Sequence, residues 1–273
     1  MKDSCVAVII SVYKNDRLSF FTKAIDSMLE QTHKPCDLFI AIDGPLPSDL
    51  KSYIVGISSY DNIFVSFYDI NKGLAFRLNQ LIADVVATNK YKYIARMDAD
   101  DISVNSRIEK QVSFFRHNID ISVVGSDLIE INEDDDEVFY KAMPQGHDEL
   151  SAGIIKKCPF NHPSVMFRTE VFSTAIRYNA NLKNTQDYYL WVDLLNAGFK
   201  FANINEPLLK FRIDSSFHSR RGFGKAMNDL RSRFYAFKIL KCYTLSNFFH
   251  VFLLFALRIS PNFIKSFAYK KFR

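Results

Sequence analysis

The sequence predicts an α/β protein built on a mainly parallel sheet with helices on both faces. The run Cys5–Val12 is continuously apolar and rich in β-branched residues, which is typical of a central strand covered on both faces. Strand-like and helix-like segments then alternate through the first hundred residues, as in parallel βαβ units. With 273 residues, 48% of them hydrophobic, the chain is long enough to bury a substantial core.

Each expected element follows from its periodicity or its turn signals. In the first half these are strand Cys5–Val12, helix Arg17–Gln31, strand Leu38–Ile42 before the turn Asp43-Gly44-Pro45, strand Ile63–Phe67, a helix after Asn71 to about Val86, and a strand ending at Asp98. In the second half they are a helix from Asn105, strand pieces at Val123–Val124, Leu128–Ile131 and Val138–Tyr140, helix His147–Lys157, a strand reaching Arg168, a helix from Tyr188 to Gly198, and strand Leu208–Ile213.

The acidic run Glu133–Glu137 is typical of a solvated hairpin tip, and no chemistry is assigned to it. Cys5, Cys36, Cys158 and Cys242 are far apart, which argues against a disulfide framework or a zinc site and favours a reducing compartment. The N-terminus shows no signal-peptide pattern, so we expect a cytoplasmic protein.

The net charge of +5 hides an uneven distribution. Nine lysines and arginines and no acids follow Asp229, whereas the residues up to it carry 26 bases and 30 acids. The tail from Ala226 is helical in pattern and aromatic, but its apolar run Leu245–Leu257 is shorter than the roughly 20 residues that span a bilayer. We expect the tail to lie on an anionic membrane surface. The alternative is a helical pair packed on the domain itself or on a second subunit. Nucleic acid is a poorer partner because no binding motif accompanies the basic tail.

Three acids follow the buried strand that starts at Tyr91: Asp98, Asp100 and Asp101. Ligands bind at the carboxyl ends of strands in open α/β sheets, and in extended backbone Asp98 and Asp100 share a face. Two such carboxylates suit Mg²⁺ or Mn²⁺. The alternative is an acidic cap of the next helix. Strand one runs into Ser11-Val12-Tyr13-Lys14-Asn15 without a glycine-rich phosphate loop, so a bound diphosphate would need a metal.

Two further side chains are open to more than one interpretation. Asp187 precedes a helix and is either a general base or an acid favoured by the helix dipole. His162, beside Pro163, is either a substrate contact or a structural histidine. The loop Asp214–Gly224, rich in Ser, His and Arg, is suited to holding phosphate charge.

Together these segments resemble the family 2 glycosyltransferases of GT-A fold, in particular bacterial enzymes that build O-antigen or capsular polysaccharide. The likeness covers about residues 4–221 and rests on seven motifs in order. They are Val8–Asn15, Ile42-Asp43-Gly44, Asn71–Asn79, Ala95–Asp101, Arg107–Gln111, His162–Arg168 and Gln186–Trp191.

The resemblance implies a role for each matching residue. Ser11, Tyr13 and Asp43 correspond to the nucleotide pocket, with Asp43 on the uracil ring, and Asn71, Gly73 and Asn79 match the segment that lines the nucleotide sugar. Arg96 precedes the acids, as it often does in this group, and is expected to bind the nucleotide. Asp98 and Asp100 correspond to the D-x-D pair that holds metal and ribose, and Asp187 matches the catalytic base. Candidate acceptor or phosphate contacts are His162, Gln186, Trp191, Arg212 and His218.

The resemblance also implies an inverting, Mn²⁺- or Mg²⁺-dependent transfer from a nucleoside-diphosphate sugar, with UDP favoured. The implied acceptor is an undecaprenyl-diphosphate-linked saccharide at the cytoplasmic face of the inner membrane, where the enzyme would be peripheral. The expected domains are a GT-A domain over residues 1–221, divided into a nucleotide-binding half (1–101) and an acceptor half (102–221), and a helical membrane-associating extension over 222–273.

Two departures and two rivals qualify this interpretation. Many relatives have Glu-Asp where this chain has Gln186-Asp187, and many have a histidine two residues after the arginine that matches Arg212, where this chain has Asp214. A sugar nucleotidyltransferase would need a Gly-rich basic loop after strand one, which is missing. A non-catalytic carbohydrate-binding protein on the same fold is disfavoured because Asp98, Asp100 and Asp187 are intact.

Overall fold

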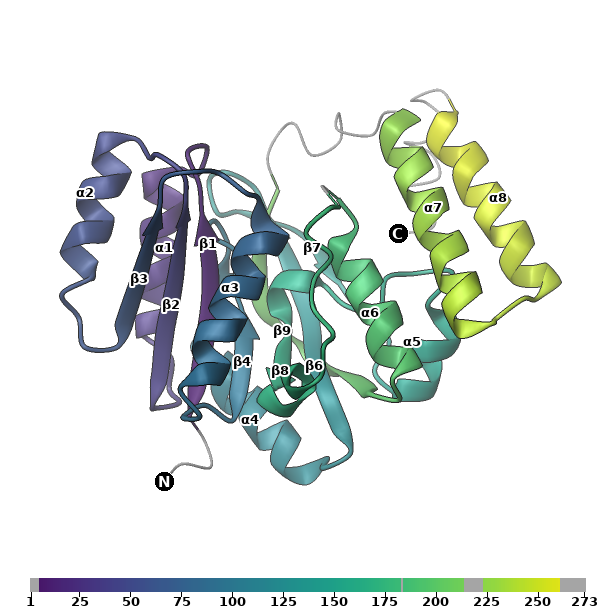
Figure 1. Ribbon diagram of the computed structural model, residues 1–273, viewed down its shortest axis with the longest axis horizontal. Coiled ribbons are helices and arrows are strands. Elements are labelled where there is room, and N and C mark those ends of the chain that lie inside the picture. Colours follow the sequence, from purple (N-terminus) through teal and green to yellow (C-terminus); the bar gives the residue numbers. More distant parts are fainter. Residues whose placement is uncertain (1–4, 183, 214–222, 261–273) are drawn as a thin grey trace.

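The computed structural model describes residues 5–182, 184–213 and 223–260 (Figure 1). Its centre is a nine-stranded mixed sheet with the strand order β3-β2-β1-β4-β8-β6-β9-β5, and β7 pairs with β6 off this path. One sheet therefore runs through both expected halves of the domain. The helices α7 (Phe223–Leu240) and α8 (Leu245–Ile259) lie beyond one end of it (Figure 1).

The first half is the parallel part of the sheet, as predicted. Its strands are β1 (Val6–Val12), β2 (Cys36–Asp43), β3 (Ile63–Tyr68) and β4 (Tyr93–Arg96), which pair in parallel. Its helices are α1 (Leu18–Leu29), α2 (Ser48–Ile57) and α3 (Leu74–Ala87). The predicted alternation is confirmed, and α2 is an additional helix that the pattern did not reveal.

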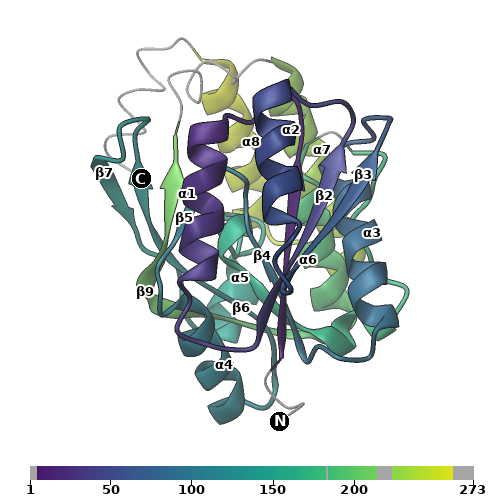
Figure 2. The same cartoon turned by 90° about the vertical axis from the view of Figure 1, so that its left-hand side faces the viewer.

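Alternate residues of β1 point into two separate cores. Val8 and Ile10 pack with residues of α1, α2 and α4 (Arg107–His117), whereas Ala7 and Ile9 pack with residues of α3 and α6 (Gln186–Asn196). Figure 2 shows α1 and α2 on one side of the parallel strands and α3 on the other. Because both faces are covered, the strands are apolar without alternation.

The second half extends the sheet with mostly antiparallel pairings. It contains β5 (Ile102–Ser103), α4 (Arg107–His117), β6 (Ile121–Ile131), β7 (Glu137–Lys141), α5 (His147–Gly153), β8 (Met166–Arg168), α6 (Gln186–Asn196) and β9 (Lys200–Arg212). Strand β8 runs antiparallel to both β4 and β6, while β6 and β9 are parallel.

The structure corrects the expected pieces around residue 125, because they form the single strand β6. The sequence hides it because Ser126 and Asp127 are polar but fully buried. Asp127 accepts hydrogen bonds from the Met143 amide (2.7 Å) and the Tyr140 hydroxyl (2.6 Å), which offset the cost of burying its carboxylate. Gly125 is required here because a Cβ would lie 2.3 Å from the Asn203 side chain.

The two C-terminal helices pack one upon the other, with α7 against the domain and α8 against α7. Helix α7 (Phe223–Leu240) contacts α6 through stacked Tyr189 and Tyr235, whose ring centroids are 4.3 Å apart. Helix α8 (Leu245–Ile259) contacts α7 through stacked Phe237 and Phe248 at 4.7 Å. In the described residues this helical pair therefore packs on the domain, and contact of its outer face with a membrane stays a prediction.

Helix α8 also leaves an apolar stripe on its outer face. Leu245, Phe249, Phe252 and Leu253 follow one another at helical spacing and are 54–90% exposed. Within the described ranges, none of the helices combines the length and apolarity that crossing a bilayer requires. The tail after residue 260 lies outside the described residues.

Candidate functional site

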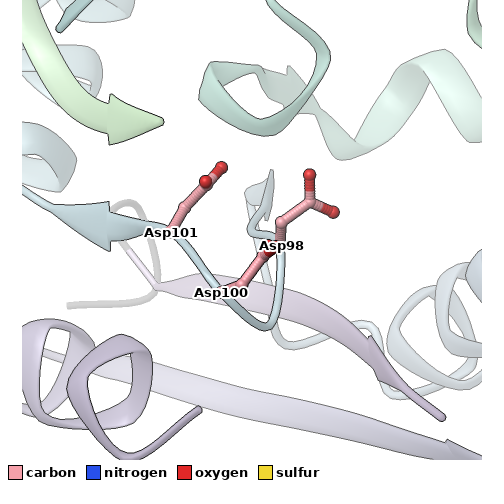
Figure 3. A group of neighbouring side chains, drawn as sticks. All are labelled: Asp98, Asp100 and Asp101. Carbon is pink, nitrogen blue, oxygen red and sulfur yellow. The ribbon is translucent and has the colours of Figure 1, made fainter. Parts of the chain in front are cut away.

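The acidic loop Met97–Asp101 joins β4 to β5 at the carboxyl edge of the parallel strands. The carboxylates of Asp98, Asp100 and Asp101 come from this one turn (Figure 3) and each offers an oxygen within 4.8 Å of the others. Asp98 and Asp100 are partly exposed, whereas Asp101 is fully buried. One Asp101 oxygen accepts from the Arg212 amide (2.9 Å), and its other oxygen, Oδ2, has no partner among the described residues.

Three buried arginines brace this loop. Arg96 forms a two-point ion pair with Asp98, one of whose hydrogen bonds is 2.8 Å. Arg107 donates to the Arg96 carbonyl (2.7 Å), and Arg212 donates from Nε to the Asp100 carbonyl (2.9 Å). The backbone of the loop is therefore fixed at both ends by guanidinium groups.

Burial makes this cluster of acids costly when it is fully ionised. Burial and the neighbouring Asp98 charge raise the pKa of Asp100 to about 6, and burial raises the pKa of Asp101 well above 3.8. A divalent cation would relieve the repulsion, and hard cations prefer carboxylate oxygens. The unpartnered Asp101 oxygen beside Asp98 and Asp100 fits such an ion, so Asp101 joins the two predicted ligands as a candidate.

Asp43 is buried where β2 ends and anchors the loop that precedes α3. Its carboxylate accepts from the amides of Lys72 and Gly73 (both 2.8 Å) and from Arg77 Nε (2.6 Å). Its carbonyl accepts from the Asn71 side chain (3.0 Å). Gly73 has φ +86°, a conformation that favours glycine. The structure thus brings Asp43, Asn71 and Gly73 together; contact of Asp43 with a base stays a prediction.

Ser11 and Tyr13 lie at the carboxyl end of β1, beside an acid that the sequence did not single out. Ser11 is half-buried and Tyr13 is 41% exposed. The Tyr13 amide donates to Asp16 (2.8 Å). Burial, together with the charges of Asp100 and Asp98, raises the pKa of Asp16 to about 7 despite that hydrogen bond. Asp16 therefore faces the acidic loop, a proximity that only the fold creates.

Asn79 and His162 meet at Tyr178. The Asn79 side chain donates to the Tyr178 carbonyl (2.8 Å) and accepts from its amide (3.0 Å), which ties α3 to this loop. His162 Nε2 lies 2.8 Å from the Tyr178 hydroxyl. Burial, with the nearby charge of Arg96, lowers the pKa of His162 well below 6.5, so the ring is neutral at physiological pH.

Asp187 lies in the first turn of α6, after a strained residue. Thr185 has φ +64°, in the left-handed region. Burial raises the pKa of Asp187 above 3.8, while the Tyr188 amide and the charge of Arg96 partly offset this. Arg96, which pairs with Asp98, therefore acts electrostatically on Asp187 as well. That Asp187 and the acidic loop form one site stays a prediction.

The remaining candidates are placed differently. Gln186 lies beside Asp187, and its Oε1 is buried without a partner among the described residues. Trp191 is fully buried in an aromatic cluster with Phe160 and Phe167. Arg212 is 5% exposed. A direct ligand contact by Trp191 or Arg212 would require side chains that the structure buries to become exposed. His218 lies outside the described residues.

Comparison with known proteins identifies the family. The model of glycosyl transferase family 2 matches residues 7–174, which include β1 and the acidic loop. An O-antigen biosynthesis glycosyltransferase of Escherichia coli, WbnJ, is 31% identical over 76% of this chain and 79% of its own length. A UDP-Gal:α-D-GlcNAc-diphosphoundecaprenol β-1,3-galactosyltransferase of Escherichia coli is 27% identical over 97% of this chain and 95% of its own.

Solved structures support the fold independently. A mannosyltransferase from Pyrobaculum calidifontis, determined in complex with GDP-Man and Mn²⁺, superposes with a TM-score of 0.61 at 11% identity. The match covers 97% of this chain and 79% of that one. With the family model spanning more than half of its length, the chain belongs to glycosyl transferase family 2.

Proposed function

We propose that this protein is an inverting glycosyltransferase of bacterial polysaccharide synthesis. Its donor would be a UDP-sugar and its acceptor a saccharide linked to undecaprenyl diphosphate. One observation carries the proposal: Arg96 pairs with Asp98 of the acidic loop, and its charge partly offsets the burial that raises the pKa of Asp187. A leaving-group site and a candidate base thereby share one centre.

Asp187 would act as the general base on the acceptor hydroxyl. Burial raises its pKa, which makes the carboxylate a stronger base than an exposed aspartate, and the Tyr188 amide and the Arg96 charge partly offset that rise. The acceptor oxygen forms the new bond to the sugar C1, and its proton passes to Asp187. The bond from C1 to the diphosphate oxygen breaks, and its electron pair leaves with the diphosphate. Attack from the opposite face inverts the anomeric centre.

Asp98, Asp100 and Asp101 would hold Mn²⁺ or Mg²⁺. When bound, the ion supplies positive charge to the diphosphate. Arg96 fixes Asp98, and Arg212 fixes the backbone of Asp100, so that these carboxylates are pre-positioned. The solved mannosyltransferase of similar fold contains Mn²⁺, which supports a divalent ion without selecting between the two.

The relatives supply the substrate class of this proposal. The name of one relative specifies UDP-Gal and a diphosphoundecaprenol-linked sugar, and that of another specifies O-antigen biosynthesis. Both matches extend over three quarters or more of this chain, beyond the acidic loop. A nucleotidyltransferase receives no comparable support.

Replacement of the base tests the reaction. Asp187→Asn should lower the transfer rate about 10²- to 10⁴-fold, because the amide cannot accept the proton. UDP binding in the presence of Mn²⁺, measured by thermal shift, should stay unchanged. Asp148→Asn is the matched control, since Asp148 is an exposed acid in the first turn of α5. Unchanged turnover of Asp187→Asn with a panel of UDP-sugars would reject the base assignment.

We propose in addition that the outer stripe of α8 binds an anionic membrane surface. Leu245 and Phe249 are 90% and 71% exposed, which is unusual for large apolar side chains grouped on one helix face. Lys238 and Lys241 flank the stripe, and the sequence adds further bases after it. An exposed apolar face with one-signed charge is typical of helices that lie in the membrane interface.

Liposome sedimentation tests this surface. Phe249→Asp combined with Leu253→Asp should release the protein from vesicles that contain phosphatidylglycerol at moderate salt. Val55→Asp on α2 is the control, because Val55 and Leu253 are both 54% exposed. Co-sedimentation of the double variant at the wild-type level would refute membrane binding by α8.

A further inference from the structure

A cavity of about 390 Å³ opens between the start of α6 and the middle of α7. Asp187, the proposed base, lines it together with Gln186 and Tyr188 of α6, and α7 contributes Asp229, Ser232 and Arg233. Its volume lies within the range of roughly 300–1,000 Å³ that is usual for small-ligand sites. The α7 residues lie outside the segment that the family model matches.

Arg233 is the only positively charged side chain among the described residues of this lining, and it is held in place. It is 8% exposed, its Nη1 donates to the Ile154 carbonyl (3.0 Å), and its guanidinium lies 4.1 Å from the ring centroid of Tyr188. Its Nε is buried and has no partner among the described residues. A buried, immobilised guanidinium with an unused donor is suited to an anion with several acceptor oxygens.

Asp187 on α6 and Arg233 on α7 line the same cavity. A sugar 1-diphosphate carries its hydroxyls and its phosphate on one ring, so a single acceptor sugar would reach both. Gln186, adjacent to the base, is neutral and adds no negative charge that would repel a phosphate. Helix α8 packs directly on α7, which places the exposed apolar stripe next to the helix that carries Arg233.

We propose that this cavity binds the sugar-phosphate end of the acceptor, with Arg233 holding the phosphate on the acceptor sugar while Asp187 receives the hydroxyl proton. The inference rests on the proposed function and deepens it, because it assigns recognition of the lipid diphosphate to α7. Sugar, diphosphate and lipid would then follow the order α6, α7, α8.

Decyl diphosphate is a direct probe, since it carries the charged group without a sugar. Binding is measured by calorimetry with saturating UDP and Mn²⁺, which keep the donor site filled, and with decanol as the uncharged comparison. The wild-type protein should bind decyl diphosphate at least tenfold more tightly than decanol. Arg233→Gln should weaken the binding of decyl diphosphate at least tenfold, and Arg233→Lys should weaken it less than Arg233→Gln does. Arg231→Gln, an exposed arginine on the same helix, should have no effect.

Several outcomes would overturn the proposal. The first is an Arg233→Gln variant with an intact UDP-dependent thermal shift that binds decyl diphosphate as tightly as the wild-type protein. The second is an Arg231→Gln variant that loses as much affinity as Arg233→Gln. The third is displacement of decyl diphosphate by UDP. A comparable Arg233-dependent affinity for dihexanoyl phosphatidylglycerol would assign the cavity to a phospholipid headgroup instead. Asp187→Asn separates this inference from the proposed function, because the variant should still bind decyl diphosphate. Unchanged turnover in Asp187→Asn would reject Asp187 as the general base. It would not affect the test of Arg233, which depends on decyl diphosphate binding.

Discussion

The acidic loop and the proposed base are held by the protein in opposite ways. The loop is fixed by Arg96 on Asp98, by Arg107 on the Arg96 carbonyl and by Arg212 on the Asp100 carbonyl. No side chain among the described residues hydrogen-bonds to the Asp187 carboxylate, which opens instead onto a cavity. A leaving group benefits from a rigid, pre-positioned site, whereas a base must keep an oxygen available for the incoming hydroxyl. The contrast predicts that variants on the two sides will fail differently.

Apart from replacement of the base, the largest effect is expected at the acidic loop itself. Asp100→Asn should lower the transfer rate about 10²- to 10³-fold, because a candidate metal ligand is lost. It should also abolish the thermal stabilisation by Mn²⁺ together with UDP. Asp134→Asn, an exposed acid of the β6–β7 hairpin, serves as the control. If Asp100→Asn keeps a normal Mn²⁺ dependence, the ion does not bind at the acidic loop, and the contrast between this loop and Asp187 is lost.

The hydrogen bonds by which Arg107 fixes the acidic loop should contribute to the free energy of unfolding. Arg107 is fully buried and donates to the Arg96 carbonyl and to Gln111 (3.2 Å). Arg107→Met should reduce the free energy of unfolding by about 3 kcal/mol, since buried acceptors lose their donors. Arg116→Met on the exposed face of α4 should stay within about 0.5 kcal/mol. Urea denaturation measures both, and equal stability of the two variants would contradict the bracing.

The pH dependence should report the base. The pKa of Asp187 is raised by burial, so its carboxylate becomes protonated, and unable to accept a proton, at a pH above the ordinary 3.8. The transfer rate should fall as the pH decreases through that raised pKa, by about tenfold for each unit below it. The measurement needs saturating Mn²⁺ and donor, because the pKa of Asp100 is also raised, to about 6. A flat profile from pH 8 to pH 4 would refute the role of Asp187.

The smallest effect is expected at the acidic hairpin that supports Arg212. Asp135 accepts from Lys23 and forms an ion pair with Arg212 at 2.6 Å. Burial raises the pKa of Asp135, but the hydrogen bonds from Lys23 and Arg212 outweigh it and the net shift is downward. Asp135→Asn should weaken Mn²⁺ binding about fivefold, the equivalent of about 1 kcal/mol, by loosening Arg212.

A thermal-shift titration with Mn²⁺ measures this effect. Glu206→Gln removes an ion pair with Lys110 between exposed side chains and should leave the Mn²⁺ affinity unchanged. If Asp135→Asn behaves like Glu206→Gln, the hairpin only covers the loop and does not position it.

The sequence predicts the parallel half well because burial on both faces makes a strand continuously apolar, as in β1 and β2. It fails at β6, where Ser126 and Asp127 are buried with polar partners that lie on other segments. The run Glu133–Glu137 forms the tip of a hairpin, as predicted. The sequence does not reveal that Glu133 and Asp135 pair there with Arg17 and Lys23 of the α1 region.

The candidate site shows the same division. Asp98 and Asp100 could be predicted together because they share one turn, whereas only the fold brings Arg96 close to Asp187 and Asp16 close to the acidic loop. Arg233 carries no recognisable motif. Its burial against Tyr188 depends on how α7 packs on α6, which side-chain periodicity does not specify.

The backbone at Thr185 has a consequence for anyone who wishes to make this enzyme more heat-resistant. A β-branched residue with φ +64° costs roughly 1–3 kcal/mol, and glycine would remove most of that penalty. A search for thermostable variants should therefore select glycine or asparagine at this position. Such variants would relax the turn that aims the next two side chains, Gln186 and Asp187, and should be slower catalysts for that reason.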